Sequence, residues 1–296
     1  MSKTTKDYFR YLYISSGDRL WGLNVTGVGA MVMEPGDPYP PGSHPSAYQF
    51  SWPQRRKLSE YQFVYVPVGE GEFESGTGGR HKIVGGTVLL TFPGDWHRYR
   101  PTPSIGWQEY WIGFEGEIAD RLVDRGIISA KQPILRTFQN ADLQHTCESL
   151  MRSVSEDQAG LQQILAAGVL TILGTALAAE RVGPNGDRHA VAIKQAKEAL
   201  ANCLEKPIRI KRLAARCHLS EAQFRRVFRQ HVGMSPNQYY LQARVARAKE
   251  LLSGGAMSIK QIAASLQFED QFHFSKTFRK QTGVSPSQWR GSRARN

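Results

Sequence analysis

The stretch LSEAQFRRVFRQHVGMSPNQY at residues 219–239 recurs as FEDQFHFSKTFRKQTGVSPSQW at residues 268–289. At an offset of 50 residues, Phe224, Phe228, Gly233, Ser235, Pro236 and Gln238 match Phe274, Phe278, Gly283, Ser285, Pro286 and Gln288. Upstream, Leu213-Ala214 matches Ile262-Ala263 at an offset of 49, so the second copy has one extra residue in its turn. Each copy predicts a short helix, a tight turn and a longer helix, which is the helix-turn-helix arrangement.

The longer helix of each copy has an apolar face and a polar face. Phe224 and Phe228 share the apolar face in the first copy, and Phe274 and Phe278 share it in the second. The polar face suits base edges, because arginine can bond guanine, glutamine can pair with adenine and alanine can touch the thymine methyl. The residues predicted to contact DNA are Ala222, Arg225, Arg226 and Arg229 in the first copy and Gln271, Ser275, Lys276 and Arg279 in the second.

A single helix is predicted between the two copies, over SPNQYYLQARVARAKELLSGG. Ser235 followed by Pro236 is typical of a helix start, and Gly254-Gly255 of a helix end. About 18 helical residues at 1.5 Å each would separate the two units by roughly 27 Å. That is close to one turn of B-DNA, so both units could enter successive major grooves.

The excess positive charge of the chain lies entirely in its last 110 residues. From residue 187 to the end there are 21 Lys and Arg against 7 Asp and Glu, whereas residues 1–186 have 17 against 19. Such a basic region attracts polyanions, because neutralising phosphates releases condensed counterions. A basic surface kept for solubility is the alternative, and the paired helix-turn-helix pattern favours DNA over it.

The first two-thirds of the chain predict a β domain followed by helices. Segments 61–68, 87–92 and 108–114 are rich in β-branched and aromatic residues, with Gly, Pro and Asp between them. Apolar residues then recur with a helical period up to residue 181. The sequence therefore predicts an α+β chain: a β-barrel or sandwich with appended helices in residues 1–181, a linker at 182–188, and an all-α domain in residues 189–296.

Cysteine usage and the N-terminus predict a cytoplasmic location. Cys147, Cys203 and Cys217 show no CxxC spacing, which fits thiols in a reducing compartment and neither a disulfide framework nor a zinc site. The N-terminal residues are polar, with no apolar signal core. The longest apolar stretch, 164–179, is interrupted by Gly and Thr and falls short of a membrane span, so it predicts a packed helix.

The run ARAKELL followed by SIKQIAASLQFEDQFHFSKTFRKQTGVSPSQW closely resembles the AraC/XylS family of transcription regulators, over about the last 100 residues. The resemblance implies base-contacting positions at Ala222, Arg225 and Arg226, and at Gln271, Phe272, Ser275 and Lys276. One departure is the turn before each longer helix, where the family usually has Gly and this chain has His218 and Gln267. A non-glycine residue in a left-handed conformation there would cost roughly 1 kcal/mol.

The segment PGDWHRY at 93–99, with VGEGEF at 68–73 taken as a turn, resembles the cupin-like sensor domain of the same family. Residues 96–116 look most like its sugar-responsive members. The resemblance implies an effector pocket lined by Arg55, His97, Tyr99, Glu109 and Trp111. Aromatic faces stack on sugar C–H groups while Arg, Glu and His bond hydroxyls, and strand alternation puts Glu109 and Trp111 on one face. Ordinary aromatic core residues are the alternative.

The helices at 141–181 resemble the dimerisation helices of this family, which implies a homodimer. The whole pattern predicts a transcription regulator, an activator of carbohydrate genes that binds double-stranded DNA and a sugar, with RNA polymerase as a further candidate partner. It predicts no membrane partner and no cofactor.

Two enzyme hypotheses are disfavoured by the sequence. A metal-dependent cupin enzyme needs a cluster of His and a carboxylate, whereas here His97 has no preceding HxH pair and His81 is a weak substitute. A DNA-alkylation repair protein needs an N-terminal acceptor cysteine, and no cysteine precedes Cys147. The Gly-rich segment 76–81 joins two predicted strands and opens no helix, so it predicts a hairpin loop and no phosphate site.

Overall fold

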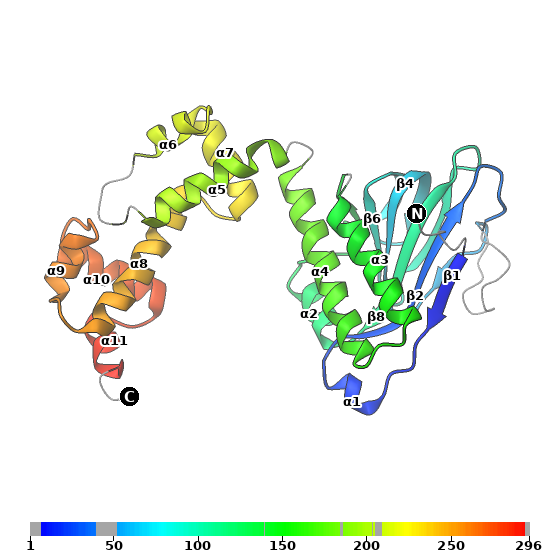
Figure 1. Cartoon of the computed structure of the whole chain (residues 1–296), viewed down its shortest axis with the longest axis horizontal. Coiled ribbons are helices and arrows are strands. Elements are labelled where there is room, and N and C mark those ends of the chain that lie inside the picture. Colours follow the sequence, from blue (N-terminus) through cyan, green and yellow to red (C-terminus); the bar gives the residue numbers. More distant parts are fainter. Residues whose placement is uncertain are drawn as a thin grey trace. The chain divides into compact units, whose positions relative to one another are not determined.

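The structure of the chain is a computed structural model that describes residues 7–39, 52–138, 140–183, 186–202, 204 and 209–293. The chain divides into two compact units, Met1–Gly183 and Pro184–Asn296. The first is an antiparallel β structure with helices and the second is all helical, which confirms the predicted α+β class (Figure 1). Part of the linker predicted at residues 182–188 is helical, because α4 continues to Val182 and α5 begins at Gly186.

Of the three cysteines, Cys203 lies outside the described residues.

The first unit is built from one antiparallel sheet. Its strands are β1 (Asp7–Tyr11), β2 (Asn24–Met33), β3 (Arg56–Lys57), β4 (Tyr61–Ser75), β5 (Gly79–Val84), β6 (Thr87–Thr91), β7 (Trp96–Pro101), β8 (Trp107–Glu115) and β9 (Ile134–Arg136). The main path runs β1-β2-β8-β4-β6-β9, while β5 and β7 pair with β4 and β3 pairs with β7. The helices of this unit are α1 (Ser16–Arg19), α2 (Glu117–Asp124), α3 (Ala141–Ser155) and α4 (Leu161–Val182). The predicted hairpin loop joins β4 to β5.

Strand β4 corrects one expectation, since residues 68–73 are strand and not a turn. Its first half pairs with β6 and β8, and its second half pairs with β5 and β7. The register with β8 shifts between Tyr65 and Val68. Gly69 follows at φ +106, where a Cβ would lie 2.4 Å from Gly106 O. A bulge and a glycine thus bend one strand from one half of the sheet into the other.

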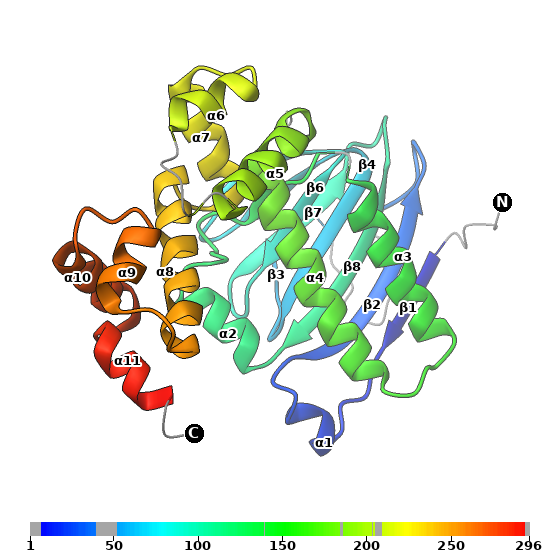
Figure 2. The same cartoon turned by 60° about the vertical axis from the view of Figure 1, so that its left-hand side comes forward.

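Helices α3 and α4 cover one face of the sheet in both views (Figures 1 and 2). The apolar face of α3, formed by Leu143, Cys147, Leu150 and Val154, is buried there, in line with the helical period of the sequence. Helix α4 is long and apolar enough to cross a membrane, and it is the one such helix within the part of the chain that the structure describes. Leu165, Val169 and Ile172 are fully buried in the sheet-facing core. The side-chain amide of Gln162 bonds both backbone groups of Val25 on β2: its Oε1 accepts from the Val25 N–H and its Nε2 donates to the Val25 oxygen, each at 2.9 Å. Helix α4 is therefore a packing helix in this structure.

The second unit consists of two helix-turn-helix units that share one helix. Its helices are α5 (Gly186–Asn202), α6 (Ile210–Arg216), α7 (Glu221–Val232), α8 (Pro236–Gly254), α9 (Ile259–Ser265), α10 (Gln271–Thr282) and α11 (Pro286–Arg293). One core surrounds Phe224 and Phe228, and a separate core surrounds Phe274 and Phe278. Helix α8 connects them and, at 19 residues, is about 28 Å long (Figure 2).

Local capping interactions explain where these helices begin. Ser220, Ser235 and Ser258 each form a reciprocal capping box with a glutamine three residues later. Asp270 caps α10 by accepting from the backbone N–H of His273 at 2.6 Å. The predicted limits of α8 are confirmed, because Gly255 follows it in a left-handed conformation at φ 70.

The turns before α7 and α10 hold the two non-glycine residues for which the sequence indicates a strained, left-handed backbone. His218 has φ 54 and Gln267 has φ 59, so both are left-handed. The residue after each donates its N–H to the preceding helix, Leu219 to Ala214 O and Phe268 to Ala263 O, both at 3.0 Å. The extra residue of the second copy also appears, because residues 217–220 join α6 to α7 while 266–270 join α9 to α10.

We expect His218→Gly to stabilise the first helix-turn-helix unit by about 1 kcal/mol, because glycine adopts this φ without a Cβ clash. Hydrogen exchange of α6 and α7 amides in the full chain should then slow roughly fivefold. As a control, Ala215→Gly at an exposed position of α6 should speed exchange, since glycine destabilises a helix interior. Faster exchange in His218→Gly would contradict the expectation.

Candidate functional site

Strand β8 presents three side chains to the interior of the first unit. Trp107, Glu109 and Trp111 alternate with Tyr110 and Ile112, which belong to the core under the helices. All three are almost fully buried, with Glu109 only 2% exposed. The expected common face of Glu109 and Trp111 is therefore what the structure shows.

Trp111 forms a flat wall of this interior. Its indole lies against Gly27 and Gly29 of β2, where a Cβ on Gly29 would stand 2.3 Å from the indole nitrogen. The ring of Tyr11 lies 5.9 Å away between centroids. Glycine at position 29 gives the indole room to lie flat on the strand, because any side chain there would collide with it; at Gly27 a Cβ would stand 3.3 Å from the indole, a tight contact.

Arg56 is the centre of the polar interior, and the sequence did not identify it. Its Nε donates to His97 Nε2 at 3.0 Å, and its Nη2 donates to Gln62 Oε1 at 3.1 Å and to Tyr99 OH at 3.0 Å. Arg55, the predicted pocket arginine, is exposed and lies over Trp96 at 4.0 Å. Pairing of Arg56 with His97 across β3 and β7 decides which of the two neighbouring arginines points inward. That register cannot be read from the local sequence.

His97 is neutral in this environment. Burial, and then the Arg56 guanidinium, lower the pKa of His97 to about 3. Because Arg56 donates to Nε2, the ring proton belongs on Nδ1, which lies 3.4 Å from the backbone oxygen of Asp95. Burial also raises the pKa of Tyr99 to about 12, so its hydroxyl stays protonated. The guanidinium therefore has neutral hydrogen-bond partners.

Tyr39 is a second interior residue that the sequence analysis missed. Its hydroxyl lies 3.5 Å from Glu109 Oε2, and its ring meets the rings of Tyr99 at 6.3 Å and Trp107 at 6.0 Å. Nearby, the buried Trp107 Nε1 and Thr91 Oγ1 have no hydrogen-bond partner within the described part of the chain. Buried polar atoms are rarely left unpaired, so these two atoms are exceptions within the first unit.

The interior brings charged, hydrogen-bonding and aromatic side chains together. The Arg56 guanidinium and the Glu109 carboxylate lie among hydroxyl, amide and indole groups, and a second carboxylate, Glu60, is buried close to Arg56. No group of three or more His, Cys, Asp or Glu gathers anywhere in the described residues. His81 Nε2 bonds instead to Gly78 O at 2.9 Å.

The predicted DNA-contacting residues of α7 lie on its exposed face. Ala222, Arg226 and Arg229 are exposed, opposite the buried rings of Phe224 and Phe228. Arg225 is half-exposed and its Nη2 forms an ion pair with Glu221 at 2.7 Å. An anion that binds Arg225 must therefore compete with Glu221.

Helix α10 presents a different set of side chains. Gln271, Lys276 and Arg279 are exposed, and Phe272 is 77% exposed, which is unusual for an aromatic ring. The hydroxyl of Ser275 donates to Gln271 O at 2.8 Å within the helix. Its oxygen remains an acceptor.

Two family models match this chain. Residues 35–171 match an AraC-like ligand binding domain, and residues 213–292 match a helix-turn-helix domain. The HTH-type transcriptional activator RhaR of Cronobacter sakazakii is 30% identical over 181 residues, which cover 60% of this chain and 59% of that protein. The uncharacterized HTH-type transcriptional regulator YidL of Escherichia coli K12 is 26% identical over 246 residues, which cover 81% and 80%.

Among solved structures, a transcriptional regulator from Chromobacterium violaceum with an AraC-type DNA-binding domain is 30% identical, with a TM-score of 0.34. It covers 36% of this chain and 96% of that chain.

The two matched domains, in this order, are those of a transcription regulator and not of an enzyme. The ligand-binding match includes the strands that carry Arg56, Tyr99 and Glu109, and the helix-turn-helix match includes both α7 and α10. This chain belongs to the AraC family of transcription regulators.

Proposed function

We propose that this protein is a cytoplasmic, sequence-specific DNA-binding activator of carbohydrate genes, controlled by a sugar bound inside its first unit. The observation that carries the proposal is the combination of a polar, aromatic-walled interior with two exposed recognition helices in one chain. Residues 1–181 would bind the effector and residues 189–296 would bind DNA. RNA polymerase is a candidate partner of the activator.

The geometry of the second unit supports binding to successive major grooves. Helix α8, about 28 Å long, holds two recognition helices whose polar faces are exposed. The first face carries arginines, which can bond guanine bidentately, and the second carries Gln271 and Lys276. We infer that the first helix contributes more to sequence discrimination than the second, because a lysine is a less directional donor.

Arg226→Ala should relax base preference at one or two positions, most strongly guanines, while Lys276→Ala should weaken binding more evenly across sequences. A good bidentate contact discriminates by about 1–3 kcal/mol, or roughly 5- to 150-fold. Binding-site selection on the full-length protein and both variants, at one salt concentration, measures this. Glu117→Gln in the first unit is the matched surface control. Absence of duplex binding by the wild type even at low salt would refute the function itself.

The interior of the first unit supports a sugar as its effector. Trp111 and Trp107 offer ring faces for C–H groups, while Glu109, Arg56 and Tyr39 surround them with acceptors and donors. Glu60, a second buried carboxylate on this side of the sheet, adds an acceptor close to Arg56. A neutral polyol can bond both the carboxylates and the guanidinium.

Glu109→Gln should weaken sugar binding about 10- to 150-fold, because a hydrogen bond to a charged acceptor is worth about 1.5–3 kcal/mol. Isothermal titration of the full-length protein with a panel of pentoses and hexoses measures the affinity. Glu117→Gln, the same substitution on exposed α2, should bind as the wild type does. If a sugar binds equally well to Glu109→Gln, the interior is not its site; if none binds the wild type, the effector belongs to another class.

Helix α4 also supports a homodimer formed through residues 141–181. Its buried face packs on the sheet, yet its opposite face remains apolar and exposed. The residues of that face are Ile164, Ala167, Leu170, Thr171, Gly174 and Ala178. Small residues in such a stripe allow two helices to approach closely, and burial of Ile164 and Leu170 would favour association.

Leu170→Glu should convert the dimer to a monomer, because a carboxylate at the centre of an apolar helix interface must be desolvated without a partner. Sedimentation equilibrium at micromolar concentration measures the mass. Val68→Glu, which places the same charge on an exposed apolar position of β4, should leave the dimer intact. A dimeric Leu170→Glu protein would exclude α4 as the interface.

A further inference from the structure

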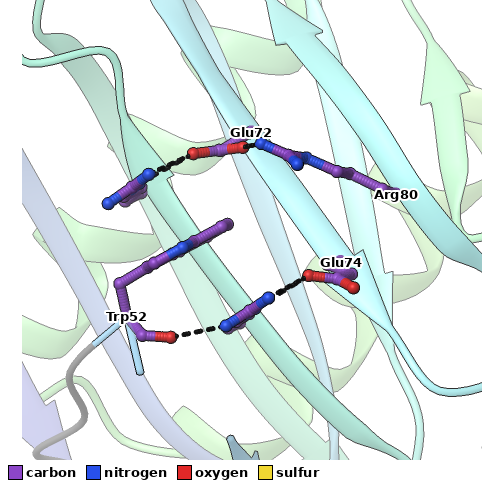
Figure 3. Close-up of polar contacts among 6 residues, drawn as sticks. Trp52, Glu72, Glu74 and Arg80 are labelled. Atoms are coloured by element: carbon purple, nitrogen blue, oxygen red, sulfur yellow. Dashed lines mark hydrogen bonds and ion pairs between the residues drawn. The ribbon is translucent and has the colours of Figure 1, made fainter. Parts of the chain in front are cut away.

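The outer surface of β4 and β7 carries a charged ladder that the function proposed above does not use. Glu72 faces Arg100 and Glu74 faces Arg98 directly across the two strands. The Nη2 atom of Arg100 lies 2.6 Å from Glu72, and that of Arg98 lies 2.5 Å from Glu74. Arg80 of β5 forms a second ion pair with Glu72 (Figure 3). These pairs hold both guanidinium groups in fixed positions above the sheet.

Trp52 is inserted between the two guanidinium groups (Figure 3). The Cζ atom of Arg98 lies 4.4 Å from the Trp52 ring centroid and that of Arg100 lies 4.0 Å from it. Arg98 Nη1 also donates to the backbone oxygen of Trp52 at 2.8 Å. Residues two apart on a strand stand about 7 Å apart on one face, which leaves a slot one aromatic ring thick. Cations on both faces of an indole attract its ring quadrupole.

The segment that Trp52 anchors is the one that carries Arg56. Trp52 lies four residues before Arg56, on the outer side of β7, while Arg56 points to the inner side. Strand β3 itself has only two residues, Arg56 and Lys57, paired with His97 and Trp96. One further backbone bond, from Gly94 N to Leu58 O, follows it. So short a strand at a sheet edge has few bonds to keep it paired, and the Trp52 slot adds an anchor on its other side.

We propose that Trp52, held between Arg98 and Arg100, is a positioning residue that keeps Arg56 inside the first unit. It contacts the outer surface only, and it acts on the interior through the three residues that connect it to Arg56. Loss of the anchor would let β3 separate from β7, withdraw Arg56 from His97, Gln62 and Tyr99, and admit water to the interior. The effect on effector affinity rests on the proposed function, whereas the position of Arg56 does not.

His97 reports the position of Arg56 without any effector. The groups that face its ring are the Arg56 guanidinium on β3, the parallel ring of Tyr99 at 6.5 Å and the backbone oxygen of Asp95. Burial and Arg56 together keep the pKa of His97 at about 3. A histidine exposed to water titrates near 6.5. Withdrawal of Arg56 therefore raises the pKa of His97 and frees its Nε2.

The test is a pH titration of the full-length protein with ¹⁵N-labelled histidine, followed by ring-nitrogen NMR, with His97→Gln used to assign the signal. In Trp52→Ala, the pKa of His97 should rise by at least about one unit, a tenfold change in proton affinity. Trp52→Phe, which keeps a ring in the slot, should restore the wild-type value. Arg80→Ala, which removes an exposed ion pair of the same ladder without touching Trp52, should also leave it unchanged.

If Trp52→Ala does not fold, Arg100→Gln removes one of the two stacked cations and should raise the pKa in the same direction by a smaller amount. An unchanged His97 titration in folded Trp52→Ala overturns the proposal, as does an equal rise in Arg80→Ala, which would indicate general loosening. Sugar affinity in the same variants then separates the two proposals. A shifted His97 with unchanged sugar binding leaves the positioning role intact and refutes Arg56 as a sugar contact.

Discussion

The architecture of the first unit depends on one constraint, the sharing of strand β4 between two halves of the sheet. The strand bends at the bulge after Tyr65 and at Gly69, so its two ends pair with different neighbours. Strands β7 and β8 are thereby brought to opposite sides of one interior. Tyr99 comes from the first and Glu109 from the second, and both meet Tyr39 there. Without the bend these side chains would lie on one flat surface open to water.

A closed interior with this composition has an energetic consequence. Withdrawing a guanidinium from water is costly unless its donors find acceptors, and Arg56 donates to His97, Gln62 and Tyr99. Trp107 Nε1 and Thr91 Oγ1 have no such partner within the described residues. Leaving such buried atoms unpaired costs free energy in the folded state.

The sequence predicted the second unit in more detail than the first because its signals are local. Ser235, Pro236 and Gly255 cap α8 through contacts within a few residues, and the repeat locates both recognition helices. The interior of the first unit depends on pairing between distant strands. Arg56 was missed in favour of Arg55 because only the register with His97 separates them. Residues 68–73 contain two glycines, which suggest a turn locally, whereas pairing with β5 and β7 keeps them in a strand.

The second unit has two cores, so the relative orientation of its recognition helices depends on α8. That helix packs on α5 and α7 near one end and on α9, α10 and α11 near the other. Tyr239 at its start meets Phe228 edge-on at 5.7 Å between ring centroids. Arg244, one and a half turns further on, stacks over Phe268 at 3.7 Å. Phe268 belongs to the turn that holds left-handed Gln267, so a side chain of α8 fixes the turn that aims α10. Aromatic contacts to both cores along one rigid helix therefore determine the separation and the relative angle of the two polar faces that would meet a duplex.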